Sequence, residues 1–262
     1  VISTFILVFP RLYYELFPND SSWFKEVLLF VSQYSNTALF TSIIIAISFL
    51  FIPNKKIRFS IILLGFIIAL LINQLEYYSI IIGLLIPTVI HVYIFTLIFM
   101  LVGALKTKSN FGYISFAIAM LLPLVFVFID ISQNNYLFST SMKAIYTENG
   151  FHRIPVVLAK ILGISDGKTF FFYEKIELRM MMFLSFIYLY HYLNWFSKTT
   201  TISWHKNLTL KSSIVIGVIW VVLLFLFYYN FRVGFLISLF FSFLHVILEF
   251  PLNVLSIKKL FS

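Results

Sequence analysis

The class of fold is decided by an apolar run at residues 79–104, which reads SIIIGLLIPTVIHVYIFTLIFMLVGA. The run contains no Asp, Glu, Lys or Arg, and it exceeds the roughly 20 apolar residues that a helix needs to cross a bilayer. A second apolar run, with Glu249 as its one charged residue, fills residues 233–254. Both segments therefore predict transmembrane helices.

The composition of the whole chain agrees with these two segments. Of the 262 residues, 61% are hydrophobic and only 11% are charged, whereas a soluble domain carries about 25% charged residues. So few polar side chains cannot cover a soluble fold, and an integral membrane protein is expected. The basic residues that give the net charge of +9 are scattered between the apolar runs. They therefore indicate how the chain is oriented in the membrane rather than a nucleic-acid partner. Cysteine is absent, which excludes disulfides and thiolate metal sites.

The apolar runs predict an all-α, polytopic helical bundle of about eight transmembrane helices, with residues 1–262 forming a single transmembrane domain. The eight segments are 1–17, 34–53, 59–75, 79–104, 112–131, 178–196, 212–230 and 233–254. We expect the last of them to end near Pro251. The connection 132–177 is predicted to be an outer loop with a short amphipathic helix at 153–164, lying on the outer leaflet or forming a lid over a substrate entrance.

The basic residues of the short connections set the expected orientation. Cytoplasmic loops carry an excess of Lys and Arg, and this rule puts both termini in the cytoplasm, with the chain in a bacterial inner membrane. The basic residues assigned to the cytoplasmic side are Lys55, Lys56, Arg58, Lys106, Lys108, Lys198, Lys206, Lys211, Lys258 and Lys259.

The last apolar run carries polar residues on one face. Gly234, Ser238, Ser242, His245 and Glu249 follow one another at spacings of three or four residues, which makes them neighbours on a helix. An ionised carboxylate facing lipid is costly. The polar end of this face must therefore meet protein or a water-filled cavity.

Other histidines are expected in the same inner layer. His191 lies near the cytoplasmic end of its segment with Asn194 three residues on, and His205 follows in the next loop. His91 follows Pro87 by one turn, where proline can kink a helix and open a pocket. The helical rise places His91 about 8–10 Å deeper in the membrane than His191. We therefore expect His91 to be the least secure member of the group of site residues.

Two imidazoles and one carboxylate make a ligand set for zinc or non-haem iron that leaves positions open for water, oxygen or substrate. We predict His191, His245 and Glu249 as metal ligands, with His205 or His91 as a further ligand or cofactor-binding residue. Glu249 and Asn194 are the predicted catalytic residues, with Asn194 holding a ligand or bound water. A b-type haem between two histidines is a less favoured alternative. The absence of any cofactor, with each histidine bonding across a helix interface, also stays open.

The leading hypothesis is thus a membrane-embedded, metal-dependent enzyme acting on a lipid or other apolar substrate, with oxidation slightly preferred over hydrolysis. The alternative is a transporter or an accessory subunit with a membrane protein partner. In a transporter, Asp130 and Glu249 would be the titrating residues. The sequence has none of the HExxH, paired histidine-box, DDxxD, GxSxG, P-loop or GxGxxG motifs of well-marked enzymes.

Overall fold

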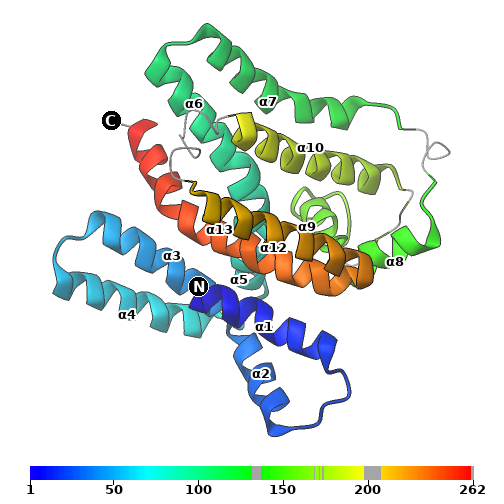
Figure 1. Cartoon of the computed structure of the whole chain (residues 1–262). Helices are drawn as coiled ribbons and strands as arrows, with labels where there is room; N and C mark the ends of the chain where they lie inside the picture. Colours follow the sequence, from blue (N-terminus) through cyan, green and yellow to red (C-terminus); the bar gives the residue numbers. More distant parts are fainter. Residues whose placement is uncertain (132–136, 168, 171, 173, 198–207, 261–262) are drawn as a thin grey trace. The chain divides into compact units, whose positions relative to one another are not determined.

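The computed structural model (Figure 1) describes the chain except for residues 132–136, 168, 171, 173, 198–207 and 261–262. The regular elements among the described residues are all helices, which confirms the all-α class. The chain divides into two compact units, and that both belong to a single transmembrane domain stays a prediction. Unit 1 comprises Val1–Pro87 and Trp204–Ser262, and unit 2 comprises Thr88–Ser203.

Unit 1 combines the N-terminal helices with the last two helices of the chain. In it, α1 packs on α2, α3 and α13, α3 also packs on α4 and α13, and α12 packs on α13. The elements are α1 (Ile2–Leu16), α2 (Trp23–Gln33), α3 (Ser35–Phe51), α4 (Lys55–Ile72), α5 (Glu76–Ile80), α12 (Leu210–Tyr229) and α13 (Phe231–Leu260).

The core of unit 1 lies where α1, α3 and α13 meet. Leu7, Leu39 and Phe243 are buried there, one from each helix, and Tyr78 and Ile82 belong to the same cluster. Helix α13 continues through Pro251 to Leu260 rather than ending near this proline.

A π-helix, η1 (Ile81–Phe95), follows α5 and contains Pro87. Proline has no backbone N–H, so one backbone hydrogen bond is missing within η1. The boundary between the two units falls directly after Pro87. Wide helical turns of this kind often occur at functional sites, and η1 carries His91.

Unit 2 contains the rest of η1 and the middle helices. In it, α7 packs on α6 and on α10, and α10 packs on α9. The elements are α6 (Thr96–Thr107), α7 (Asn110–Phe128), α8 (Thr140–Glu148), α9 (Arg153–Ile161) and α10 (Lys175–Ser197).

The core of unit 2 joins η1 to α10. Val92, Leu184 and Ile187 are buried together, and Ile154 and Leu158 of α9 pack against them. Helix α9 therefore presents its apolar face to protein. Its exposed end, at Ile161 and beyond, remains free to meet lipid.

An aromatic cluster ties α8 to the segment before α10. The ring of Tyr146 lies within 6 Å of the rings of Phe151, Phe170 and Phe172. Burial in this cluster raises the pKa of Tyr146 to about 12. The aromatic stretch before α10 thus supports local packing in this unit.

Side-chain caps explain where several helices begin. Asn54 accepts hydrogen bonds from the backbone N–H groups of Lys56 and Ile57 at the start of α4. Ser109, Ser139 and Thr209 cap α7, α8 and α12 in the same way. Each cap satisfies a backbone donor that has no partner within its helix.

Three described helical stretches are long and apolar enough to cross a membrane: Tyr77–Thr107, Leu210–Tyr229 and Phe231–Leu260. A fourth span arises if α2 and α3, bent by 50°, count as one. This number does not support eight spans. Four other predicted segments do not count among these spans. Helix α1 has 15 residues, and the apolar stretch of α7, Asn110–Phe126, is also short. Helix α4 has three basic residues in its first turn, and α10 carries charges in its first turns.

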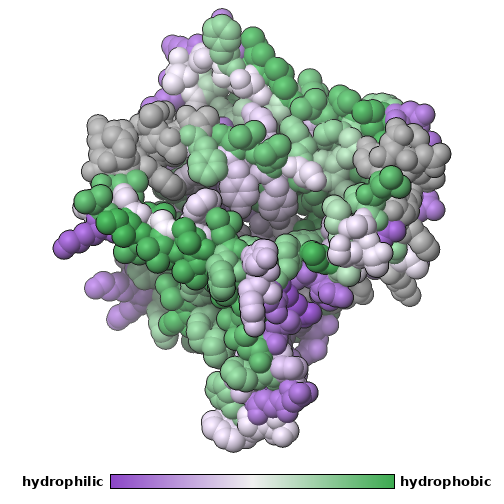
Figure 2. Space-filling model, turned by 45° about the vertical axis from the view of Figure 1, so that its right-hand side comes forward, coloured by the Kyte–Doolittle hydropathy of each residue, from purple (hydrophilic) through white to green (hydrophobic). Residues whose placement is uncertain are grey.

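The surface is as apolar as a membrane protein requires. Helix α12 has no buried residue, although its sequence is almost wholly apolar. Apolar side chains cover much of the face in Figure 2. Exposure of such a helix to water would cost about 25 cal/mol for each Å² of apolar surface, so a lipid environment is the favourable one.

Candidate metal centre

Two buried histidines meet in unit 2. His91 of η1 and His191 of α10 are 2% and 4% exposed, and their ring centroids are 5.4 Å apart. The rings are inclined at 61°. Imidazole is a common ligand of zinc, iron and copper, and two imidazoles side by side in an apolar interior form a candidate metal centre.

The hydroxyl of Thr96, at the start of α6, fixes the second ring. Thr96 Oγ1 and His191 Nδ1 are 2.8 Å apart, and both side chains are buried. In the tautomer with hydrogen on Nδ1, His191 donates to Thr96 and keeps the lone pair of Nε2 available. Metal-binding histidines are commonly oriented by such a hydrogen bond from the other ring nitrogen.

The distance between the ring nitrogens is close to the distance expected for two ligands of one metal ion. A ring nitrogen of His91 and one of His191 lie within 4.8 Å of each other. Two bonds of about 2.0–2.1 Å to a single ion would bring them to about 4.2 Å or less. A small rotation of either ring therefore lets both nitrogens bind the same ion.

The surroundings of the two rings are apolar and aromatic. Val92 and Ile187, which are buried, belong to the same helices as the histidines, and α9 packs against both. The Tyr190 hydroxyl donates to Met100 Sδ at 3.3 Å, which joins α10 to α6. This packing keeps bulk water from the two buried rings.

His245 and Glu249 lie in unit 1, on α13. His245 Nε2 is 2.9 Å from Glu249 Oε2, and the side chains are 40% and 8% exposed. The spacing of four residues thus produces a direct contact. Asn253, fully buried, and Ser256 continue this face of α13. That His245 and Glu249 share an ion with His191 stays a prediction.

The structure says little about the two remaining residues of the predicted site, Asn194 and His205. Asn194 is half-buried on α10, three residues after His191, and its role as a holder of a ligand or water stays a prediction. His205 lies outside the described residues.

Sequence reasoning missed Thr96. The available signal was a hydroxyl residue in an otherwise apolar run, five residues after His91. The partner of Thr96 is His191, 95 residues further along the chain, so the period of a single helix could not reveal the contact.

Asp130, the other residue proposed for a transporter pathway, lies at the surface. Its carboxylate is 90% exposed and accepts a hydrogen bond from Lys175 Nζ at 3.0 Å. Nearby, Arg179 donates to the carbonyl oxygen of Ile129. An exposed pair of this kind stabilises a fold only slightly and is typical of helix ends at an interface.

No family model, curated protein or solved structure matches this sequence. The function is therefore inferred from the residues and their geometry.

Proposed function

We propose that this protein is a membrane-embedded, metal-dependent enzyme acting on a lipid or other apolar substrate, with its centre at His91 and His191. The observation that carries the proposal is the contact of these two buried imidazoles. The hydrogen bond between Thr96 and His191 supports it by holding one ring in place. Further ligands would come from His245 and Glu249, with Asn194 orienting a ligand or a bound water.

Iron and zinc are the proposed ions, and the metal decides the reaction class. Zinc with open positions lowers the pKa of a bound water and supports hydrolysis, whereas iron with nitrogen and carboxylate ligands supports oxidation by dioxygen. Oxidation is slightly preferred. The apolar surroundings of the rings suit a substrate that arrives from the membrane.

Metal analysis and an absorption spectrum of the purified protein test the centre. We expect about one ion per chain in the wild type, and loss of the ion in His91→Ala and in His191→Ala. His152→Gln is the matched control, because His152 lies in the same unit outside the centre. Equal metal content in all four proteins would rule the centre out. A Soret band would identify a haem instead.

The contribution of α13 is measured separately. If His245 and Glu249 complete the ligand set, His245→Ala and Glu249→Gln each lower the metal content or its affinity. Unchanged metal binding in both variants would limit the site to unit 2 and leave the α13 pair with another role.

The alternative function is that of a non-enzymatic transporter or accessory subunit, in which the polar side chains hold helices together. The hydrogen bond between α6 and α10 favours it, because polar side chains commonly join membrane helices. Thr96→Val would then lower the free energy of unfolding by about 0.6–1.7 kcal/mol without affecting any metal. Thr107→Val is the control, because Thr107 bonds only to the carbonyl of Gly103 in its own helix.

We further propose that the chain crosses a bacterial inner membrane eight times, with both termini in the cytoplasm. Helices α4 and α7, of 18 and 19 residues, are about 27–29 Å long at 1.5 Å per residue, close to the 30 Å hydrocarbon core. They pack along α3 and α6, respectively. The basic first turn of α4 then lies in the cytoplasmic interface.

A further inference from the structure

A cluster of basic side chains lies at one end of unit 1, where the last turn of α13 meets the turn between α3 and α4. The Nζ atom of Lys258, on α13, is 5.5 Å from the centre of the ring of Phe51, the last residue of α3. This contact joins the two ends of unit 1's chain. The members of the basic cluster are Lys55, Lys56 and Arg58 of α4 and Lys258 and Lys259 of α13.

The guanidinium group of Arg58 is held in place at this turn. Its Nε donates to the carbonyl oxygen of Ile52 at 3.0 Å, and its Nη2 donates to that of Pro53 at 3.3 Å. The group also lies over the ring of Phe49, 4.3 Å from the ring centre. These bonds use two of the five N–H donors of the side chain. Arg58 and Lys258 therefore adjoin the same turn, and donors of both remain for an anion.

The sequence around the basic cluster carries no acidic residue. Residues 27–75 contain no Asp or Glu, and none follows Glu249 in the sequence. Glu249 precedes Lys258 by nine residues, about 13 Å along the helix, and its carboxylate contacts His245. The backbone N–H groups at the start of α4 add a partial positive charge. The cluster therefore attracts anions.

Exposed apolar side chains flank the basic cluster. Phe49 lies under the guanidinium of Arg58, and Ile57 and Phe59 are the neighbours of Arg58 in the chain; all three are exposed. Helix α13 is long and apolar enough to cross a membrane, and α3 passes the same test together with α2. Basic groups at the end of such helices lie at the membrane–water interface, where the phosphates of lipid headgroups are.

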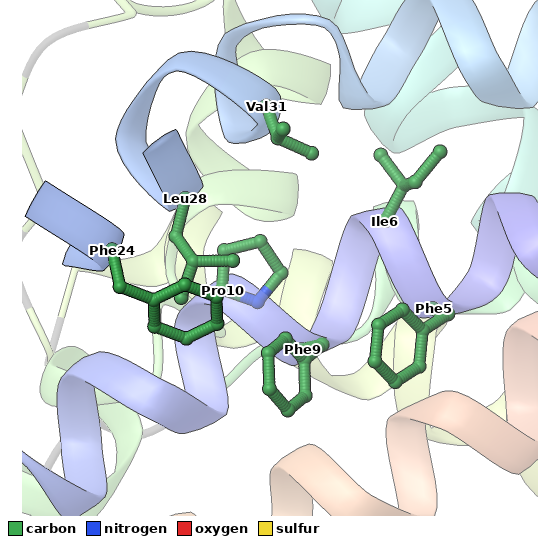
Figure 3. A pocket seen from close by; sticks show the side chains of 7 residues that line it. All are labelled: Phe5, Ile6, Phe9, Pro10, Phe24, Leu28 and Val31. Atoms are coloured by element: carbon green, nitrogen blue, oxygen red, sulfur yellow. The ribbon is translucent and has the colours of Figure 1, made fainter. Parts of the chain in front are cut away.

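The turn between α1 and α2 lies at the other end of the α2–α3 pair, because these two helices follow each other with a bend of 50°. Charges of both signs are present there. Arg232 Nε is 2.8 Å from Glu15 Oε2, and Asp20 accepts hydrogen bonds from Tyr13 and Ser22. The groove between α1 and α2 adds no charge, because its lining is wholly apolar (Figure 3). The two ends of unit 1 thus differ in charge.

From these observations we infer that the basic cluster binds the phosphate of one anionic phospholipid. Arg58 and Lys258 contact the phosphate at the turn between α3 and α4, and the three other lysines strengthen the attraction. Phe49 and Phe59 contact the lipid below its headgroup. A zwitterionic lipid binds less tightly, because the cluster repels its ammonium group. The site lies within unit 1 and does not depend on the proposed metal centre.

Native mass spectrometry of the delipidated protein, titrated with phosphatidylglycerol or phosphatidylethanolamine, tests the site. We expect the wild type to bind phosphatidylglycerol more tightly. Lys258→Gln should weaken this binding about fivefold, since one basic side chain near an anionic headgroup contributes roughly that factor, and Lys258→Arg should retain it. Lys25→Gln, the same change at the turn between α1 and α2, is the control. Equal binding of the two lipids by the wild type, or equal loss in Lys258→Gln and Lys25→Gln, would overturn the proposal.

The role of Arg58 needs a second variant, because Arg58→Gln also removes hydrogen bonds to the backbone. Its thermal stability is therefore measured together with its lipid binding. Lys55 is exposed, so Lys55→Gln removes a charge from the cluster without this effect. Both variants should weaken the binding of phosphatidylglycerol. Unchanged binding in Lys55→Gln and in a folded Arg58→Gln contradicts the site.

Photolabelling locates the lipid and distinguishes it from other anions. Phosphatidylglycerol with a photoreactive headgroup should label residues 49–59 or 252–260 of the wild type, and an excess of unlabelled phosphatidylglycerol should prevent the labelling. Labelling confined to other segments contradicts the site. Equally effective competition by inorganic phosphate or by an RNA oligonucleotide, at the same concentration, would show that the cluster does not select a lipid.

Discussion

The tautomer of His191 determines what the two histidines of unit 2 can do. With hydrogen on Nδ1, the ring donates to Thr96 Oγ1 and its Nε2 can bind a metal; with hydrogen on Nε2, the threonine hydroxyl donates instead and Nε2 cannot. A bound cation favours the first tautomer. The same residues thus serve as a metal centre or as a packing contact, and the metal content distinguishes these roles.

A pH dependence of stability is expected from His152. Burial and the adjacent Arg153 guanidinium hold the pKa of His152 below its ordinary value of 6.5, although the Tyr146 carbonyl partly offsets this. The unfolded chain therefore binds more protons below pH 6.5, and the contribution of His152 is fully present above that pH. It is lost as the pH falls through the lowered pKa.

Thermal unfolding of the wild type and of His152→Gln, measured between pH 7.5 and 5, checks this expectation. The wild type should lose more stability on acidification than the variant, because glutamine does not titrate. Arg153→Gln should raise the pKa of His152 and reduce the loss. Parallel curves for the wild type and His152→Gln would contradict the assignment.

Contacts between residues of one helix could be predicted from the sequence, and contacts between residues far apart in the chain could not. The spacing of His245 and Glu249 places both on one face of a single helix, and the two side chains are in contact. His91 and His191 are separated by 100 residues, so their contact depends on how η1 and α10 pack. The depth in the membrane predicted for His91 was calculated with a regular α-helical rise, whereas residues 81–95 form a π-helix.

At the scale of helices, the position of α10 determines the position of His191. Ile187, one turn before this histidine, is 1% exposed and packs with Val92 of η1, next to His91. Apolar sequence predicted this helix but not which of its faces is buried, because lipid and protein interior favour similar side chains. The short helix α9 covers the same core, which its sequence alone does not reveal.

Truncation of Ile187 tests this packing. Ile187→Ala should lower the free energy of unfolding by roughly 2–5 kcal/mol, because it leaves a cavity in a close-packed interface. Leu189→Ala is the control on the same helix, since Leu189 is 62% exposed and its loss should cost little. Unfolding in detergent provides the measurement, and equal losses in the two variants would contradict the assigned face.

At the scale of the whole molecule, the number of crossings depends on α4 and α7 as well as on α1 and α10. If both helices cross the membrane, Lys56 and Lys106 lie on the cytoplasmic side and Glu148 lies outside. If neither crosses, a single span separates Lys56 from Lys106, and Lys106 shares a side with Glu148. Three positions therefore test whether α4 and α7 cross.

The absence of natural cysteine allows a direct measurement of these sides. All three residues are exposed, so Lys56→Cys, Lys106→Cys and Glu148→Cys can be treated in intact cells with a maleimide that does not cross membranes. We expect labelling of Glu148→Cys alone, and labelling of the other two only after the membrane is permeabilised. Val222→Cys, within α12, is the control that should stay unlabelled in both states. Labelling of Lys106→Cys in intact cells, with Lys56→Cys protected, would show that α4 does not cross, because only then do the two lysines lie on opposite sides. Labelling of both Lys106→Cys and Glu148→Cys in intact cells would show that α7 does not cross.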